Sequence, residues 1–207
     1  MSDVSLSARD TAVGDVEIIF YVDDDDEPSI EAAYELGCEV ATGPRITLSD
    51  TYNRCAEIAT GEILMGACDA VVFKTPGWDE LVEAEFAKVP DKILLVFGDD
   101  EIHHGGGATL PFLHRRWMEV VGRFYPDCFP CDYPDTWVHE IAKALGRAVY
   151  LPNLITQHRH PLAGTAPMDK THEERMARGE AYDVAGIWAR TAPERFAETA
   201  LLRAAMS

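Results

Sequence analysis

Asp69, His158 and His160 are residues whose types and positions suggest a metal site. Asp69 follows the apolar run Ile63–Cys68 in the stretch GEILMGACDAVVFKTPGWD, and the two histidines follow the last predicted strand in the sequence QHRHP. In open α/β sheets, ligands bind beyond the carboxyl ends of the strands. Carboxylate and imidazole ligands together suit Mn²⁺ or a similar divalent ion. We therefore expect Asp69, His158 and His160 to contact a metal, with a turn-capping Asp and a structural His as the alternative roles.

Two further acidic positions are candidates for contact with a ligand. The run Asp23–Asp26 ends the apolar segment Val16–Val22, and Asp135 precedes a predicted helix in YPDTW. Carboxylates are pure acceptors, which suits ribose hydroxyls and the N–H groups of a base, although a solvated acidic turn explains the run equally well. Asp135 is by default a helix N-cap, and the same carboxylate deprotonates a hydroxyl if it faces a cleft.

Alternating strands and helices must position these residues. The predicted strands are 16–22, 39–41, 63–68, 71–73, 91–98 and 148–151, the last with an extension at 154–156. The predicted helices are 4–11, 29–37, 49–60, 78–88, 112–121, 136–145, 173–178 and 184–205. The unbroken apolar run Ile63–Cys68 is typical of a buried central strand in a parallel sheet. The alternation predicts an α/β fold with a mostly parallel central sheet flanked by helices, and it puts Asp23, Asp69 and Asp99 at one sheet edge.

Composition excludes several classes of function. The 207 residues carry a formal net charge of −18, which argues against nucleic-acid binding because phosphate backbones require Lys and Arg. An anionic substrate would need a metal ion or a local basic patch. No apolar run is long enough for a membrane span and residues 1–15 do not resemble a signal peptide, so we expect a cytoplasmic protein with free cysteines. The single CxxC pair, Cys128 and Cys131, is only a weak zinc signal.

The loop HHGGGA at 103–108 is similar to the oxyanion-hole loop of lipases and esterases. Those enzymes also need a G-x-S-x-G nucleophile elbow, and the sequence contains none. We therefore discard that hydrolase class and expect a mobile flap over the site.

The ordered set of motifs resembles the family 2 inverting glycosyltransferases with the A-type nucleotide-sugar fold. The matching segments are the strand and DDDD run at 16–26, LSDTYNRCAEIATGEILMGACDAVVF at 48–73, WMEVVGRF at 117–124, YPDTW at 133–137 and RAVYLPNLITQH at 147–158. The resemblance covers roughly residues 14–160. It implies a single Rossmann-like domain, with residues 1–160 as the nucleotide-sugar-binding and catalytic part and 161–207 as a helical extension packed on it.

The resemblance also implies roles for individual residues. Asp23, with Asp24 or Asp25, contacts the base and ribose of a nucleotide-diphosphate sugar donor, and Asn53 lies near that donor. Asp69 is the first acid of the metal and diphosphate motif, and His158 completes the site of a divalent ion, Mn²⁺ or Mg²⁺. Asp135 is the general base that takes the proton from the hydroxyl of an acceptor, whose nature the sequence leaves open.

Two departures from the family pattern keep other functions open. The acid that normally follows the first one is replaced here by Ala70 and Val71, and no strand with a Thr-Arg turn precedes Val16. Either the chain is truncated or the sheet lacks an interior strand. The alternative functions are a catalytically degenerate relative that binds a nucleotide sugar or a partner, and a metal-dependent hydrolase built on Asp69, His158 and His160 with Asp135 as base.

Overall fold

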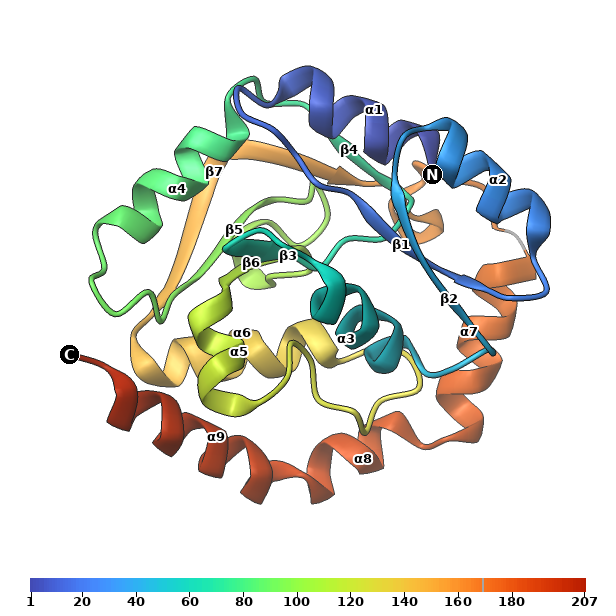
Figure 1. Cartoon of the computed structure of the whole chain (residues 1–207). Helices are drawn as coiled ribbons and strands as arrows, with labels where there is room; N and C mark the ends of the chain where they lie inside the picture. The colour runs from blue at the N-terminus through green and yellow to red at the C-terminus, as the bar shows by residue number, and fades with distance from the viewer. Residues whose placement is uncertain (169) are drawn as a thin grey trace.

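The computed structural model describes residues 1–168 and 170–207, in which strands and helices alternate along the chain (Figure 1). The strands are β1 (Ile19–Asp23), β2 (Glu39–Gly43), β3 (Ile63–Met65), β4 (Val71–Phe73), β5 (Leu95–Asp99), β6 (Pro111–His114) and β7 (Ala148–His158). The α-helices are α1 (Ser2–Thr11), α2 (Glu27–Glu35), α3 (Leu48–Ile58), α4 (Trp78–Ala87), α5 (Arg115–Val121), α6 (Pro134–Leu145), α7 (Lys170–Ala181), α8 (Val184–Arg190) and α9 (Ala192–Ala205). Two short 3₁₀ helices are η1 (His104–Gly106) and η2 (Pro161–Ala163).

The strands form two separate sheets, one of two strands and one of five. β1 and β2 pair in parallel, and the larger sheet has the order β3-β6-β5-β7-β4. In that sheet only β5 and β7 are parallel, whereas the β3–β6, β5–β6 and β4–β7 pairs are antiparallel. The prediction of an α/β fold is confirmed, but the prediction of a mostly parallel central sheet is wrong. The connection between β5 and β6 contains no α-helix, and a short connection of this kind joins antiparallel strands.

Several predicted elements have different bounds in the structure, and the helix predicted at 184–205 is divided at Thr191 into α8 and α9. The predicted central strand Ile63–Cys68 is the shorter β3, which is half-buried and lies at the edge of the five-stranded sheet. It ends at Met65, and at the next residue, Gly66, a Cβ atom would lie 2.3 Å from the Tyr125 hydroxyl. The predicted helix 112–121 begins only at Arg115, because the preceding apolar residues form β6 between β3 and β5. The His114 side chain accepts a hydrogen bond from the Arg116 amide and caps α5.

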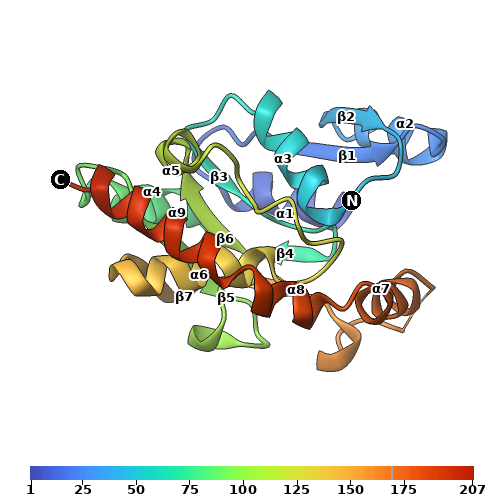
Figure 2. The same ribbon diagram turned by 90° about the horizontal axis from the view of Figure 1, so that it is seen from below.

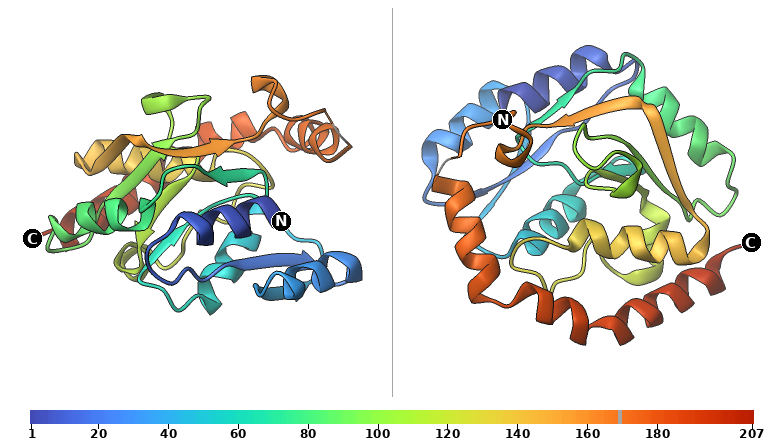
Figure 3. Two further views of the ribbon diagram at one scale, coloured as in Figure 1. Left: turned by 90° about the horizontal axis from the view of Figure 1, so that it is seen from above. Right: turned by 180° about the vertical axis from the view of Figure 1, so that it is seen from behind.

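Both faces of the five-stranded sheet are covered by helices (Figure 3). Successive residues of β5 point to opposite faces: Val96 packs with α1 and α4, whereas Leu95 and Phe97 pack with α5, α6 and α9. The C-terminal helix α9 is fixed on α6 by Glu198, which is buried and accepts a 2.7 Å hydrogen bond from the Trp137 indole. Among the described residues, no helix is both long and apolar enough to cross a membrane.

The carboxyl ends of three strands in the larger sheet lie at one edge. β5 is parallel to β7, and both β3 and β5 are antiparallel to β6, so β3, β5 and β7 run in one direction. Figure 2 shows the β1–β2 pair apart from this sheet, with the carboxyl end of β1 on the same side of the molecule. The strand ends that carry the candidate residues therefore meet on one side of the protein.

Candidate functional site

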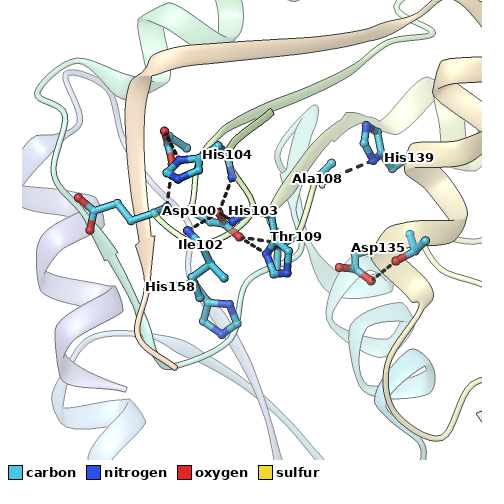
Figure 4. Close-up of polar contacts among 12 residues, drawn as sticks. Asp100, Ile102, His103, His104, Ala108, Thr109, Asp135, His139 and His158 are labelled. Atoms are coloured by element: carbon cyan, nitrogen blue, oxygen red, sulfur yellow. Dashed lines mark hydrogen bonds and ion pairs between the residues drawn. The ribbon is translucent and has the colours of Figure 1, made fainter. Parts of the chain in front are cut away.

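The shared edge brings four of the acidic and histidine positions into one region. Asp69 lies between the ends of β3 and the start of β4, Asp100 follows β5, and His158 ends β7. The His158 amide donates to the Asp100 carbonyl at 3.0 Å, which joins two of these strand ends directly. Figure 4 shows Asp135, at the start of α6, across from this group. We call this region the carboxyl edge.

Asp69 is an exposed carboxylate that lies between two cavities. Its side chain is 68% exposed, and a carboxylate oxygen lies 3.8 Å from the amino group of Met1. A cavity of about 750 Å³ between β1 and β3 includes Asp69 in its lining. A second cavity of about 350 Å³ is lined by Asp69 together with Arg159, Thr165 and His172, and is much more polar in character. Asp69 therefore has both an apolar and a polar neighbouring space.

The two histidines of QHRHP lie close to each other and to a third histidine. The ring centroids of His158 and His160 are 5.4 Å apart, and those of His160 and His172 are 5.3 Å apart. The Nε2 atom of His158 faces the Cys68 thiol at 3.5 Å, while its Nδ1 atom is buried without a hydrogen-bond partner. Burial lowers the pKa of both His158 and His160, which favours the neutral form of each ring. Neutral imidazole is the form that binds metals.

The expected metal ligands do not form a metal centre by themselves. Within residues 1–168 and 170–207, no group of three or more His, Cys, Asp or Glu side chains is arranged to hold an ion. His158 is directed to Cys68 rather than to Asp69. A cation at this edge would need ligands from a bound molecule or from water.

Asp100, which the sequence analysis did not select, fixes the loop that follows β5. Its carboxylate is 2% exposed and accepts hydrogen bonds from the amides of Ile102, His103 and His104. It also accepts from the Thr109 hydroxyl at 2.9 Å and contacts His103 Nδ1 at 2.8 Å. Burial by itself raises the pKa of such a carboxyl, but these hydrogen bonds outweigh it and lower the pKa of Asp100 to about 2.

This network gives the HHGGGA loop a different character from the flap that the sequence predicts. Asp100 pins its first residues, and the Ala108 amide at its end donates to His139 of α6 at 3.4 Å (Figure 4). The His103 Nδ1 atom faces Asp100, so the Nε2 atom lies on the opposite side of the ring. The His103 side chain is 56% exposed. A carboxylate that holds an imidazole in this way orients it for proton transfer or hydrogen bonding.

The adjacent pair, Asp99 and His104, repeats the arrangement on the exposed side. His104 Nδ1 lies 2.9 Å from Asp99, which also accepts a hydrogen bond from the Tyr150 hydroxyl at 2.9 Å. The contact with Asp99 raises the pKa of His104. The sequence DDEIHH could have indicated both pairs. Its two aspartates precede its two histidines closely enough for one turn of the loop to bring each Asp to a His.

Asp135 lies in the first turn of α6 and is half-buried. Burial raises its pKa above the ordinary value for Asp, although the amide of Thr136 opposes this. The charge of Asp135 acts on the hydroxyls of the half-buried Tyr52 and the buried Tyr125, whose ring centroids are 5.1 Å apart. Burial raises the pKa of both tyrosines, and the charge of Asp69 also acts on Tyr52.

The acidic run at the end of β1 divides into residues with different roles. Asp26 caps α2 by accepting from the Ser29 amide, and Asp23 forms an ion pair with Arg45 at 2.7 Å. Asp24 and Asp25 are exposed in the turn between them. Asp23 is thus partly committed to the local structure, whereas Asp24 and Asp25 face solvent.

Asn53 has a structural role in the described structure. Its side-chain oxygen accepts from the amides of Phe124 and Tyr125, and its amide group donates to the Tyr125 carbonyl at 2.9 Å. These three bonds tie α3 to the segment that carries Tyr125. The prediction that Asn53 lies near a donor is untested, but its polar atoms are already engaged by the backbone.

Replacing Asn53 with Ala should therefore reduce stability rather than ligand binding. The change leaves two amides and one carbonyl without their partner, so we expect a loss of about 2 kcal/mol in the free energy of unfolding. Chemical denaturation measures this loss. The neighbouring exposed residue Arg54, paired with Glu57, is the matched control, and Arg54→Ala should change stability by less than about 0.5 kcal/mol. If Asn53→Ala is as stable as the wild type but fails to bind a ligand, Asn53 belongs to the binding site and its structural role is contradicted.

Comparison with known proteins supports the fold and nothing finer. No protein-family model and no curated protein matches the sequence. A solved structure described as "Crystal Structure of a Mycobacterial Protein" superposes with a TM-score of 0.54 at 14% sequence identity. The superposition covers 79% of this chain and 64% of that mycobacterial chain, so this protein spans less than two thirds of its length. At this identity, the similarity is one of mixed α/β fold alone.

Proposed function

We propose that the protein is an inverting glycosyltransferase that binds a nucleotide-diphosphate sugar at the carboxyl edge and transfers the sugar to an acceptor hydroxyl. The observation that carries this proposal is the contrast between two carboxylates whose charges both act on the Tyr52 hydroxyl. Asp135 is half-buried with a raised pKa, whereas Asp69 is exposed and lies beside a polar cavity. Carboxylates whose surroundings differ in this way are suited to different chemical roles.

Asp135 is the general base in this proposal. It takes the proton of the acceptor hydroxyl while the hydroxyl oxygen forms a bond to the anomeric carbon and the bond to the diphosphate breaks. A base works best when its pKa is close to the working pH. Burial at the start of α6 moves the pKa of Asp135 in that direction. His103, oriented by Asp100, is a second polar group for positioning the acceptor.

The donor diphosphate fits the polar cavity beside Asp69. Arg159 supplies a guanidinium that matches phosphate oxygens, while the Thr165 hydroxyl in the same lining is hydrogen-bonded to the backbone of His160. Arg159 also pairs with Asp3, so its charge is shared with that carboxylate. This local cation meets the requirement that the net charge of −18 imposes on an anionic substrate. Asp23, Asp24 and Asp25 are the proposed contacts to the base and ribose.

The divalent cation belongs to the proposal only as an ion that accompanies the diphosphate. Asp69 is the carboxylate that would contact a Mn²⁺ or Mg²⁺ ion, with His158 and His160 as neighbouring neutral imidazoles. Because the described residues do not form a closed metal centre, the diphosphate or water would supply the remaining ligands of such an ion. Binding with and without Mn²⁺ will separate the two contributions.

Thermal denaturation with nucleoside diphosphates tests the donor site. A ligand at 100 times its Kd stabilises the native state by about 2.7 kcal/mol. For a chain of this length, that corresponds to a rise of about 5–10 °C in Tm. We expect such a rise with UDP or another nucleoside diphosphate and a larger one with Mn²⁺ added. Asp69→Asn should reduce the rise, while Asp127→Asn, an exposed aspartate paired with Arg123, should leave it unchanged. No rise with any nucleoside diphosphate would contradict the proposal.

A second candidate is a protein that binds the donor without turnover. The exposure of Asp69 and the side chains at Ala70 and Val71 favour it, because they leave one carboxylate where a second would strengthen metal binding. Donor binding without transfer or hydrolysis under any acceptor condition would select this candidate.

A further inference from the structure

A cavity of about 750 Å³ lies between the two sheets, and we call it the β1–β3 slot. β1 and the residues 14–18 before it form one wall, and β3 forms the opposite wall. Residues of α3 close one face, while residues of α1 and α4 close the other. Figures 1 and 2 show the β1–β2 pair separated from β3 in both views. The slot thus has strands on two sides and helices on the other two, as the position of an interior strand in an α/β sheet does.

The strand edges that face the slot are not paired. β1 pairs with β2 on its other side, and β3 pairs with β6 on its other side. Throughout the described chain, no strand joins the two sheets. Half of the backbone N–H and C=O groups of each strand point away from the existing partner and toward the slot. Such edges bind an additional strand through main-chain hydrogen bonds.

The walls of the slot are apolar but incompletely buried. Ile19 and Phe20 in β1 and all three residues of β3 are half-buried, whereas the first residues of β5 and β6 are buried. Protein interiors normally contain few voids larger than a water molecule. An apolar cavity of this size between two unpaired strand edges is therefore better explained as a binding site than as a packing defect.

The contacts at one end of the slot favour an extended chain as its ligand. At its closed end, the Glu17 side chain crosses the gap and accepts hydrogen bonds from the Thr60 amide and hydroxyl at 2.8 and 3.0 Å. The Glu17 side chain and its hydrogen bonds thus span the gap at this end, while β1 and β3 themselves do not pair. A strand between two others needs them about 10 Å apart. A helix with its side chains is itself about 10–12 Å in diameter and needs a wider gap.

The charge of the slot constrains its ligand. The lining contains no Lys, Arg or His side chain, and the cation it does contain is the amino group of Met1, which lies 3.8 Å from Asp69. Its acidic residues are Asp15, Glu17, Asp69, Asp79 and Glu83. Glu17 and Asp79 are engaged by backbone amides and Asp69 lies beside the Met1 amino group, whereas Asp15 and Glu83 are exposed carboxylates at the rim. Basic side chains at the ends of a bound segment would complement this rim.

We propose that the β1–β3 slot binds an extended segment of a partner polypeptide as an additional strand. The segment has β-branched or other apolar residues within the slot and Lys or Arg at its ends. This proposal does not depend on the transferase activity, since the polar cavity lies on the other side of Asp69.

Selection of random twelve-residue peptides displayed on phage tests the proposal with the full-length chain. We expect enriched peptides to contain an apolar extended core with basic ends. Hydrogen exchange should then show slowed amides, by tenfold or more, in both Ile19–Asp23 and Ile63–Met65 when an enriched peptide is added. Replacing the central residue of that peptide with Pro, which removes an N–H donor, should lower its affinity by tenfold or more.

Variants of the protein test whether the peptide binds in the slot. Ala59→Trp places a large ring in the slot and should weaken the peptide by tenfold or more, whereas Ala87→Trp, on the exposed side of α4, should not. Peptides that protect neither strand, or only one, would overturn the proposal, as would the absence of any enriched peptide. Protection of both strands in a homodimer without peptide would also overturn it, because the occupant would then be a second copy of this chain.

Discussion

Replacing Asp135 with Asn should lower sugar transfer by about 10²–10⁴-fold, the usual contribution of a general base, while donor affinity is unchanged. Asn has nearly the same shape but cannot accept the proton of the acceptor hydroxyl. The change should reduce kcat rather than raise the KM for the donor. Initial rates with the donor identified by thermal denaturation measure kcat, and the Tm shift measures donor binding in the same variant.

A carboxylate on the same helix provides the matched control. Glu140 is exposed on α6 and lies 3.8 Å from Arg195, so Glu140→Gln should leave the transfer rate unchanged. Because burial raises the pKa of Asp135, the wild-type rate should increase with pH through a pKa above that of an ordinary Asp. Retained turnover in Asp135→Asn would remove Asp135 from the base role.

Local sequence patterns predicted many of the elements but not how the strands pair. Segments such as 16–22 and 136–145 carry their own signals, in β-branched residues and in flanking Pro and Gly. The antiparallel insertion of β6 between β3 and β5 has no comparable signal, because Pro111–His114 is a short apolar run compatible with a helix or a strand. Pairing depends on which distant segments bury each other, and this information is not local.

The candidate site shows the same division. Asp69 and His158 each follow a predicted strand, and this position alone predicted that both lie at one edge of the sheet. Which polar atoms are free was not predictable: Asn53 is engaged by the backbone, and Asp100 is buried by its own loop. The contacts of Asn53 depend on residues far apart in the sequence, and those of Asp100 depend on the geometry of the turn that follows it.

The buried carboxylate Asp100 should make the largest single electrostatic contribution to stability among the residues of the carboxyl edge. Its pKa falls from 3.8 to about 2 on folding, which corresponds to about 2 kcal/mol. Asp100→Asn should therefore lower the free energy of unfolding at pH 7 by about 2 kcal/mol and Tm by about 4–8 °C. Glu119→Gln, at an exposed ion pair with Arg116, is the control and should change stability by less than about 0.5 kcal/mol.

The difference between wild type and Asp100→Asn should also depend on pH in a defined direction. A carboxyl whose pKa is lower in the folded state stabilises the protein above the unfolded pKa and loses this contribution as pH falls through the folded pKa. The difference should thus be complete above about pH 5 and shrink between about pH 4 and pH 2. Chemical denaturation of both proteins across this range measures it, and the subtraction removes the other carboxylates, which titrate alike in both. A difference that stays constant to pH 2 would mean that the hydrogen bonds to Asp100 do not depend on its charge, and that the His103 loop is held by geometry alone.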